Sequence, residues 1–280
     1  MWEMVLKVLL ETANILLVVM LLMIVIEFFE LRYKGKLLEI ITRNQVSQYI
    51  VASLLGAIPG CIDAFFVVSL YVHGLVSFGA LTAVMLSTAG DEAFVMLAMI
   101  PEAILPILVI CAVIGIIGGF FTDKVVNLVK LKLSQPCVID VHEEEPDLKH
   151  FFKEHVYSHI IKKHVPKLFV WLFSTMMAVN FIMVTFDLSQ FLPQNKLLLI
   201  VLAALVGIIP ESGPHLAFTI LYSKGLIPFS VLLVNTLSQD GHGLLPLMSY
   251  SLKDTFYVQV FTTAIALIVG LMLFFVGLSA

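Results

Sequence analysis

Acidic and histidine side chains gather at short interruptions of otherwise apolar stretches in this sequence. The members of this set that could bind a cation are Asp63, Asp91, Glu92, Glu211, His215, Asp240 and His242. A charge inside a membrane costs at least about 2.5 kcal/mol on insertion scales, so charges kept at such places indicate function. Carboxylates and imidazoles together form a ligand set for a divalent transition metal. Protons are expected to compete with the metal, because either relieves the repulsion between clustered carboxylates.

Neutral ligands and helix-breaking residues surround these charges. The side chains that could support a bound cation are Cys61, Ser87, Asn235, Ser238 and Gln239, and the helix breakers are Pro59, Gly60, Gly90, Pro210, Gly213 and Gly241. Proline removes a backbone donor and glycine permits unusual dihedral angles, so both unwind a helix. Backbone groups freed inside lipid must be satisfied by protein, water or a bound ion. Two plainer interpretations stay open: the breaks are short loops outside the membrane, and Cys61 is a small packed residue.

A second group of histidines lies in the polar centre of the chain. Five of the eight histidines fall between residues 142 and 164, among acidic side chains. From Leu148 onward the spacing predicts an amphipathic helix, on which His155 and His159 are one turn apart and share a face. This geometry is common among metal ligands, and the alternative is a plain cytoplasmic connector. We therefore expect an accessory cytoplasmic metal contact, at most, at His155 and His159.

The composition indicates which elements position these residues. The chain has 280 residues, of which 60% are hydrophobic and 13% charged, and its mean hydropathy is +1.04. A soluble domain carries about 25% charged residues, and a helix that spans a bilayer needs about 20 apolar ones. The long apolar stretches are 4–29, 46–72, 75–100, 103–122, 168–188, 197–223, 226–250 and 256–278. The sequence therefore predicts an all-α, polytopic membrane protein with the lipid bilayer as its solvent.

Charge, cysteine content and motifs argue against other classes of protein. The net charge of −4 argues against nucleic acid as a partner, and the scattered Cys61, Cys111 and Cys137 argue against a disulfide framework. No cleavable signal peptide is expected, because the first apolar stretch is long enough to span the membrane. Nucleotide-binding and hydrolase motifs are absent from the sequence, so we expect neither an enzyme nor a tightly bound cofactor. A homodimer is an open alternative to a monomer.

The two halves of the sequence repeat each other at an offset of 151 positions. Residues 56–92 align with residues 207–243 without a gap. The identical pairs that chance explains least well are Gly56/Gly207, Pro59/Pro210, Tyr71/Tyr222, Gly74/Gly225, Ser87/Ser238 and Gly90/Gly241. We therefore predict two copies of one structural unit, each containing two broken or re-entrant helices.

Basic residues predict how the two copies are oriented. Short basic loops stay cytoplasmic, and Arg and Lys residues gather at 31–45 and at both ends of 123–167. An even number of crossings must then separate these segments, whereas three apolar stretches lie between them. One stretch is therefore split or re-entrant, and the copies are inverted relative to each other, as in many secondary transporters. This predicts an N-terminal membrane repeat at 1–126, a cytoplasmic linker at 127–166 and a C-terminal membrane repeat at 167–280.

Several motifs in the two copies carry a family resemblance. They are GAIPGC at 56–61, GIIPESGPH at 207–215, and SQDG at 238–241 followed by GLLP at 243–246. They resemble the ten-helix heavy-metal exporters, also labelled manganese transporters or arsenic-efflux-like proteins, over roughly 48–100 and 197–250. In that family a second acidic residue often follows the SQDG glycine, where this sequence has His242. The resemblance implies metal export across the cell (inner) membrane and supports manganese less strongly.

The residues and the resemblance together predict a secondary transporter that exports a divalent transition-metal cation, manganese or a similar ion, in exchange for protons. An inverted repeat brings equivalent positions together near its axis. The residues expected to converge near the bilayer midplane are Asp91, Glu92, Asp240 and His242, with Asp63, Glu211 and His215 close by. One alternative is an exporter of an oxyanion or small organic acid, bound at positive helix ends. The other is an intramembrane metalloenzyme, which has no need for matched breaks in both halves.

Overall fold

The computed structural model describes residues 2, 5–17, 20–21, 40–60, 62–134, 165–185, 195–210 and 212–276. Within these residues the chain forms helices joined by short turns, and no strand occurs. The side chains of Cys61, Glu211 and His242, the linker histidines His155 and His159, and Cys137 lie outside this description. The predictions made for those side chains therefore stay predictions.

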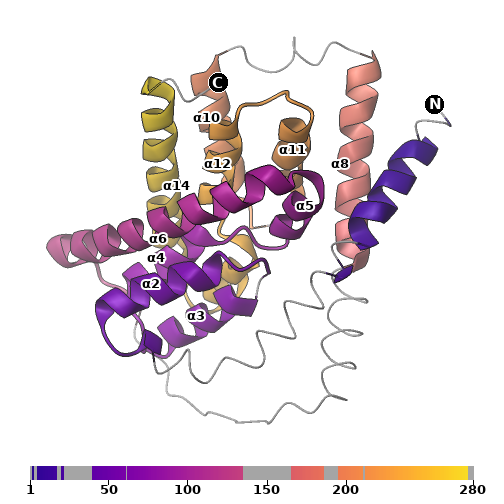
Figure 1. The fold of residues 1–280 in the computed structure, drawn as a ribbon. Coiled ribbons are helices and arrows are strands. Elements are labelled where there is room, and N and C mark those ends of the chain that lie inside the picture. The colour runs from indigo at the N-terminus through magenta and orange to yellow at the C-terminus, as the bar shows by residue number, and fades with distance from the viewer. Residues whose placement is uncertain are drawn as a thin grey trace, which may run out of the picture.

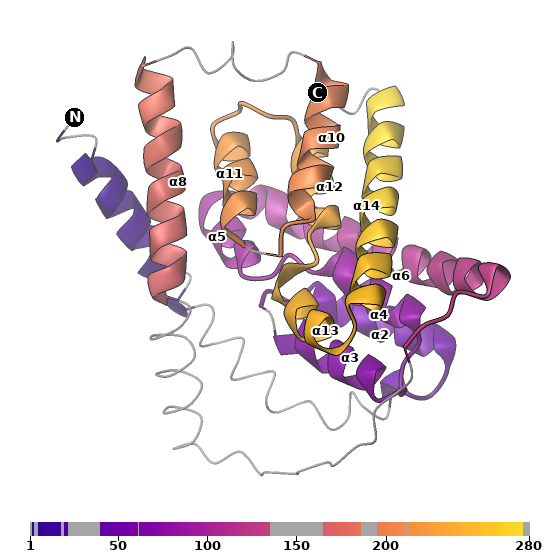
Figure 2. The same ribbon diagram turned by 180° about the vertical axis from the view of Figure 1, so that it is seen from behind.

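The helices of the first half are α2 (Gln45–Gly56), α3 (Ile62–Val72), α4 (Phe78–Ser87), α5 (Glu92–Met99) and α6 (Pro101–Val129). The helices of the second half are α8 (Val165–Thr185), α10 (Lys196–Gly207), α11 (Ser212–Ser223), α12 (Phe229–Ser238), the 3-10 turn η2 (Gly241–Gly243), α13 (Leu244–Tyr250) and α14 (Leu252–Phe275). Figures 1 and 2 show α8, α10, α12 and α14 with their axes roughly parallel, and α6 crossing them.

Four predicted apolar stretches are each divided into two helices. The stretch 46–72 forms α2 and α3, and 75–100 forms α4 and α5. In the second half, 197–223 forms α10 and α11, and 226–250 forms α12 and α13. The interruptions contain Pro59, Gly60, Gly90, Pro210 and Gly241, whereas Gly213, predicted as a helix breaker, lies in the first turn of α11.

The repeat extends to the bounds of the helices. Adding 151 to the bounds of α2, 45 and 56, gives 196 and 207, which are the bounds of α10. Adding 151 to the bounds of α4, 78 and 87, gives 229 and 238, which are the bounds of α12. The backbone also matches, because Gly90 and Gly241 have φ values of +53° and +57°. Only glycine adopts such values without strain, which explains why glycine stands at both turns.

Close helix packing explains the repeated glycine and serine pairs. A Cβ atom added at Gly56 would overlap the hydroxyl of Ser87, and one at Gly207 would overlap the hydroxyl of Ser238. The two glycines therefore let α2 lie against α4 and α10 lie against α12, and these helices are in contact. The same small residues serve the same packing in both halves.

The two halves are joined by reciprocal helix pairs. Helix α5 of the first half packs against α11 of the second, and α13 with η2 packs against α3. At the 151-residue offset, α5 corresponds to α13 and α3 corresponds to α11. Each half therefore presents the same two helices to the other half. Figure 1 shows α5 beside α11, and Figure 2 shows α13 beside α3.

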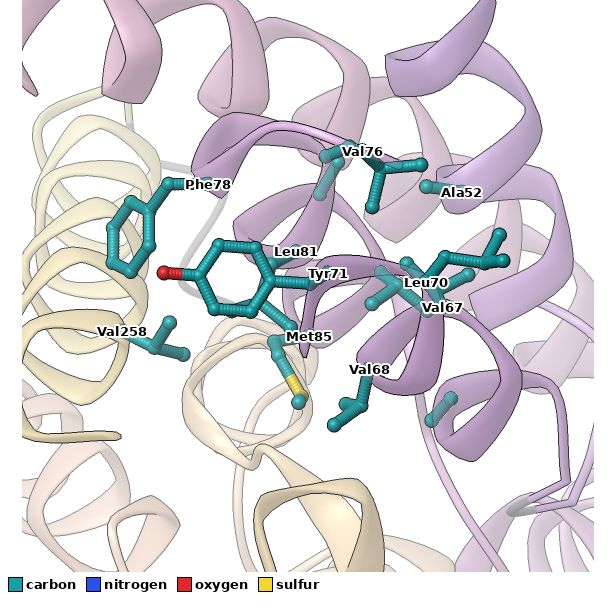
Figure 3. Close-up of a cluster of buried hydrophobic side chains, with 14 of the residues drawn as sticks. Ala52, Val67, Val68, Leu70, Tyr71, Val76, Phe78, Leu81, Met85 and Val258 are labelled. Atoms are coloured by element: carbon teal, nitrogen blue, oxygen red, sulfur yellow. The ribbon is translucent and has the colours of Figure 1, made fainter. Parts of the chain in front are cut away.

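The first half has a continuous apolar core around α4. Figure 3 shows part of it, where Tyr71 of α3 lies between Phe78 and Met85 of α4 and beside Val258 of α14. Every residue of α4 is buried, as expected of a helix enclosed by neighbours on all sides.

Membrane-length helices are present in the described part of the chain. Three helical stretches are long and apolar enough to cross a bilayer: Phe78–Met99, Pro101–Val129 and Leu252–Phe275. Large apolar side chains on α6, such as Leu105 and Leu128, are exposed, as lipid-facing side chains are in a membrane protein. The prediction of an all-helical, multi-pass membrane protein is confirmed.

Candidate functional site

The second break of each half has the same backbone path. Helix α4 ends at Thr88 with φ −79° and ψ 131°, and α12 ends at Gln239 with φ −79° and ψ 127°. An extended residue thus stops each helix, and a glycine in the left-handed region turns the chain two residues later. The two breaks meet, because a Cβ atom added at Gly241 would lie 3.6 Å from the Thr88 methyl group.

Glu92 is the carboxylate that joins the two halves. Its side chain is fully buried at the start of α5. Thr219 of α11 donates its hydroxyl hydrogen to Oε1, and Gln239 donates from Nε2 to Oε2 at 3.0 Å. Both donors belong to the second half, whereas Glu92 belongs to the first. The structure therefore places one carboxylate of the predicted site directly between the repeats.

Asp240 is buried in a different environment from Glu92. Its side chain is 2% exposed, and neither of its oxygen atoms has a hydrogen-bond partner among the described residues. The Thr262 hydroxyl of α14 is close enough to act on it, yet that hydroxyl donates to the Gln259 carbonyl at 3.2 Å. An ionised carboxylate without donors is among the most unfavourable groups to bury, so a cation or a proton has to compensate it.

Gln239 and Asp240 direct their side chains to different helices. Gln239 has extended backbone angles, in which consecutive side chains point to opposite sides. Its amide reaches Glu92 of α5, while the Asp240 carboxylate lies near Thr262 of α14. The break therefore carries polar groups on two faces.

His215 is buried, and each of its ring nitrogens faces an oxygen acceptor, of which a neutral imidazole can donate to one. Nδ1 lies 3.2 Å from Oδ1 of Asn235, and Nε2 lies 3.1 Å from the Ile209 carbonyl oxygen. Asn235 is oriented by its own donation from Nδ2 to the Ala203 carbonyl at 2.9 Å, so its oxygen faces the imidazole. Neither nitrogen is open to a metal in this conformation. The imidazole instead ties the first break of the second half to α12.

The remaining predicted residues are buried near helix starts or serve their own helices. Asp63 lies in the first turn of α3, and Asp91 directly precedes α5, positions where the helix dipole favours a carboxylate. The Ser87 hydroxyl donates to the Ala83 carbonyl at 2.7 Å, and Ser238 donates to the Asn235 carbonyl at 3.1 Å. The two serine hydroxyls are thus satisfied by backbone within their helices.

The described side chains do not form a complete metal cage in this conformation. No three His, Cys, Asp or Glu side chains within the described ranges lie close enough to hold a metal ion together. The structure brings Glu92 to Gln239, next to Asp240, and brings Gly241 to Thr88. The predicted convergence of Asp91 and His242 stays a prediction, because the His242 side chain lies outside the description.

Buried polar residues that the sequence analysis did not identify connect the helices. Thr219 holds Glu92, and its position one turn after His215 on α11 was the available signal. Asp123 of α6 accepts from the Tyr49 hydroxyl at 2.7 Å and from the Gly79 amide at 2.6 Å. Asp254 of α14 accepts from the Tyr71 hydroxyl at 2.9 Å. These two aspartates fasten helices to one another, away from the breaks.

Comparison with known proteins gives one family. The family described as "Putative, 10TM heavy-metal exporter" matches residues 12–183 and 139–277, which is nearly the whole chain. No curated protein and no solved structure matches the chain.

Proposed function

The chain belongs to this family of ten-helix heavy-metal exporters, and from that premise we propose that it is a secondary transporter for a divalent transition-metal cation, manganese or a similar ion. Export proceeds in exchange for protons. The metal is bound as substrate between two inverted repeats, in the cell (inner) membrane. No tightly bound cofactor takes part.

The observation that carries this proposal is the contact of Glu92 with Thr219 and Gln239. Carboxylate, hydroxyl and amide oxygens are ligands that suit Mn²⁺. Glu92 supplies the carboxylate, Thr219 a hydroxyl, and the Gln239 amide an oxygen once the amide turns over. Because these ligands come from both halves, a movement of one half against the other opens or closes the site.

Asp240 supplies the second negative charge in this proposal. Two carboxylates match the charge of a divalent cation, and Asp240 has no other group to neutralise it within the described residues. When the metal leaves, protons compensate the carboxylates in its place, which couples the two fluxes. Other predicted residues at the breaks, Asp63, Asp91, Glu211 and His242, complete the coordination as the halves move, and His215 joins them only when its present hydrogen bonds open.

The reciprocal helix pairs support the inverted arrangement. A two-fold rotation that exchanges the halves would carry α5 onto α13 and α11 onto α3, so that the contact between α5 and α11 would be repeated as the contact between α13 and α3, and both contacts are present. We propose that this axis lies in the membrane plane and that the breaks lie near the bilayer midplane. The segment 127–166 then forms a cytoplasmic linker between the membrane repeats 1–126 and 167–280. His155 and His159 provide an accessory metal contact on that linker.

The experiment is Mn²⁺ transport by the purified protein in proteoliposomes with an imposed pH gradient. Wild type should accumulate Mn²⁺ against its gradient when protons flow the other way, and Glu92→Gln should not. Glu102→Gln is the matched control, because Glu102 is an exposed carboxylate in the first turn of α6. Transport of an oxyanion in place of Mn²⁺ would refute the proposal, as would unchanged Mn²⁺ transport by Glu92→Gln.

A further inference from the structure

The helix pairs α5/α11 and α3/α13 correspond to each other at the 151-residue offset, but they differ in how closely their side chains pack. The pair α5/α11 is tightly packed. Val95 of α5 and Leu216 and Ile220 of α11 are buried together with Leu172 and Met176 of α8. Thr219 of α11 also binds Glu92 across this pair. Apolar side chains and the hydrogen bonds of Glu92 thus occupy this contact.

The equivalent pair α3/α13 is open. A pocket of about 390 Å³ lies between the two helices, and Val68, Ser69, Ser249 and Tyr250 contribute to its lining. In the described part of the chain, the lining comes from α3 and α13 alone. At the 151-residue offset, Ser249 corresponds to Ala98 of α5 and Ser69 corresponds to Ile220 of α11. The reverse holds at two other lining positions, because Val68 and Val72 correspond to Thr219 and Ser223 of α11, so the two pairs carry their hydroxyls at different positions.

The pocket leads toward the second break of the second half. Val68 lies in the pocket lining, and Ala64 is one turn earlier on α3. A Cβ atom added at Gly243 would lie 2.9 Å from the Ala64 side chain, so the end of this break is the neighbour of the pocket. Gly243 is the repeat partner of Glu92, since 92 plus 151 is 243. A glycine therefore stands here at the position that Glu92 occupies in the other pair.

We propose that the α3/α13 pocket is the vestibule through which a hydrated divalent cation reaches the breaks in this conformation. The inference rests on the proposed transport function and adds the route of access. Its described lining has the hydroxyls of Ser69, Ser249 and Tyr250 beside the apolar side chains of Phe65, Val68, Val72 and Pro246, and no carboxylate or basic side chain, so it can pass a hydrated cation without holding it tightly. The opposite conformation has the reverse arrangement, with α5/α11 parted and α3/α13 closed, as exchange of two repeats requires.

The test compares Ser249→Cys with Ala98→Cys, a pair matched by the repeat, in a chain whose three native cysteines are replaced. Both variants are reconstituted in liposomes opened to reagents on both sides. A cationic, membrane-impermeant methanethiosulfonate should modify Ser249→Cys about tenfold faster than Ala98→Cys, because thiol reactivity follows access to water. Mn²⁺ should slow the reaction of Ser249→Cys, and modification should block its Mn²⁺ transport once the liposomes are sealed again. Each variant is first shown to transport Mn²⁺ before modification, which confirms that it folds.

Each contrary result overturns the vestibule. Reaction with a lipid-soluble maleimide alone would show that the pocket faces lipid, and absence of any reaction would show that protein covers it. Equal modification rates of Ser249→Cys and Ala98→Cys would show that the two helix pairs do not differ in access to water. Rapid modification without protection by Mn²⁺ would show that the cation does not pass this way. Failure of the proposed function is separate, because it appears as absence of Mn²⁺ transport by the unmodified wild type.

Discussion

Replacing Glu92 by glutamine should remove metal binding without removing the fold. The new amide keeps the shape of the side chain and can still hydrogen-bond, because the Thr219 hydroxyl and the Gln239 amide can each turn from donor to acceptor. The substitution also removes a buried charge, which is unfavourable to bury. We therefore expect a melting temperature in detergent that equals or exceeds that of wild type.

The expected loss of affinity follows from the charge. Two unit charges 4 Å apart interact by about 4 kcal/mol at an effective dielectric constant of 20, and a divalent cation doubles this. Desolvation of the carboxylate and the metal offsets a large part of it. A net loss of about 3 kcal/mol corresponds to a Kd for Mn²⁺ that rises about 100-fold. The measurement is calorimetric titration of the purified protein with Mn²⁺ at fixed pH.

A charge-swapped variant provides the control. Glu92→Gln combined with Gln239→Glu moves the carboxylate across a hydrogen bond of 3.0 Å and keeps a donor opposite it. Because the charge stays at the same contact between the halves, the Kd should return to within about tenfold of wild type. If Glu92→Gln binds Mn²⁺ as wild type does, or if the swapped variant binds no better than the single one, the reasoning about this contact is wrong.

Three further predictions concern the packing, the second carboxylate and the linker. Gly207→Ala should lower the free energy of unfolding by about 1–3 kcal/mol through overlap with Ser238, and adding Ser238→Gly should restore part of it in thermal unfolding, because the overlap with the backbone of residue 238 stays; an unchanged melting temperature for Gly207→Ala would contradict this. Asp240→Asn should keep the fold but abolish Mn²⁺ transport and its dependence on pH, whereas His155→Ala should have a milder effect; normal transport by Asp240→Asn would contradict the site. Cys137 should react with an impermeant thiol reagent only from the cytoplasmic side, and reaction from outside intact cells would refute the predicted topology.

The helix breaks and the repeat were predictable because proline and glycine act on their own backbone. Pro59 and Pro210 lie just after the ends of α2 and α10, and Gly90 and Gly241 mark turns with positive φ. The identity of these residues at a fixed offset then predicted matching helices. The bounds of α4 and α12 confirm that match without a shift of one residue.

The contacts of several polar side chains involve residues distant in sequence, and residue types alone do not predict them. Ser87 and Ser238 were interpreted as support for a metal, but each hydroxyl bonds to its own helix and fits against a glycine of a neighbouring one. Helix α6 extends beyond the predicted stretch of 103–122 on both sides. At its C-terminal end, Asp123 is buried because Tyr49 and Gly79 satisfy its carboxylate, and neither partner is apparent from local sequence.

The polarity of the site also depends on tertiary contacts. Thr219 is the partner of Glu92, whereas its repeat equivalent, Val68, lies in the lining of an open pocket. At this repeat position, threonine in the second half makes a polar contact, whereas valine in the first half cannot. The sequence offset aligned the two positions, but only the structure brought Thr219 to a residue 127 positions away.

The central claim is that the metal lies between the two second breaks, and locating the metal tests it most directly. Crystals of the protein grown with Mn²⁺ would be measured at the manganese absorption edge. The account predicts an anomalous peak in direct contact with Glu92 and beside the break that contains Asp240. A peak found only on the segment 127–166, or at any place away from both breaks, would contradict it.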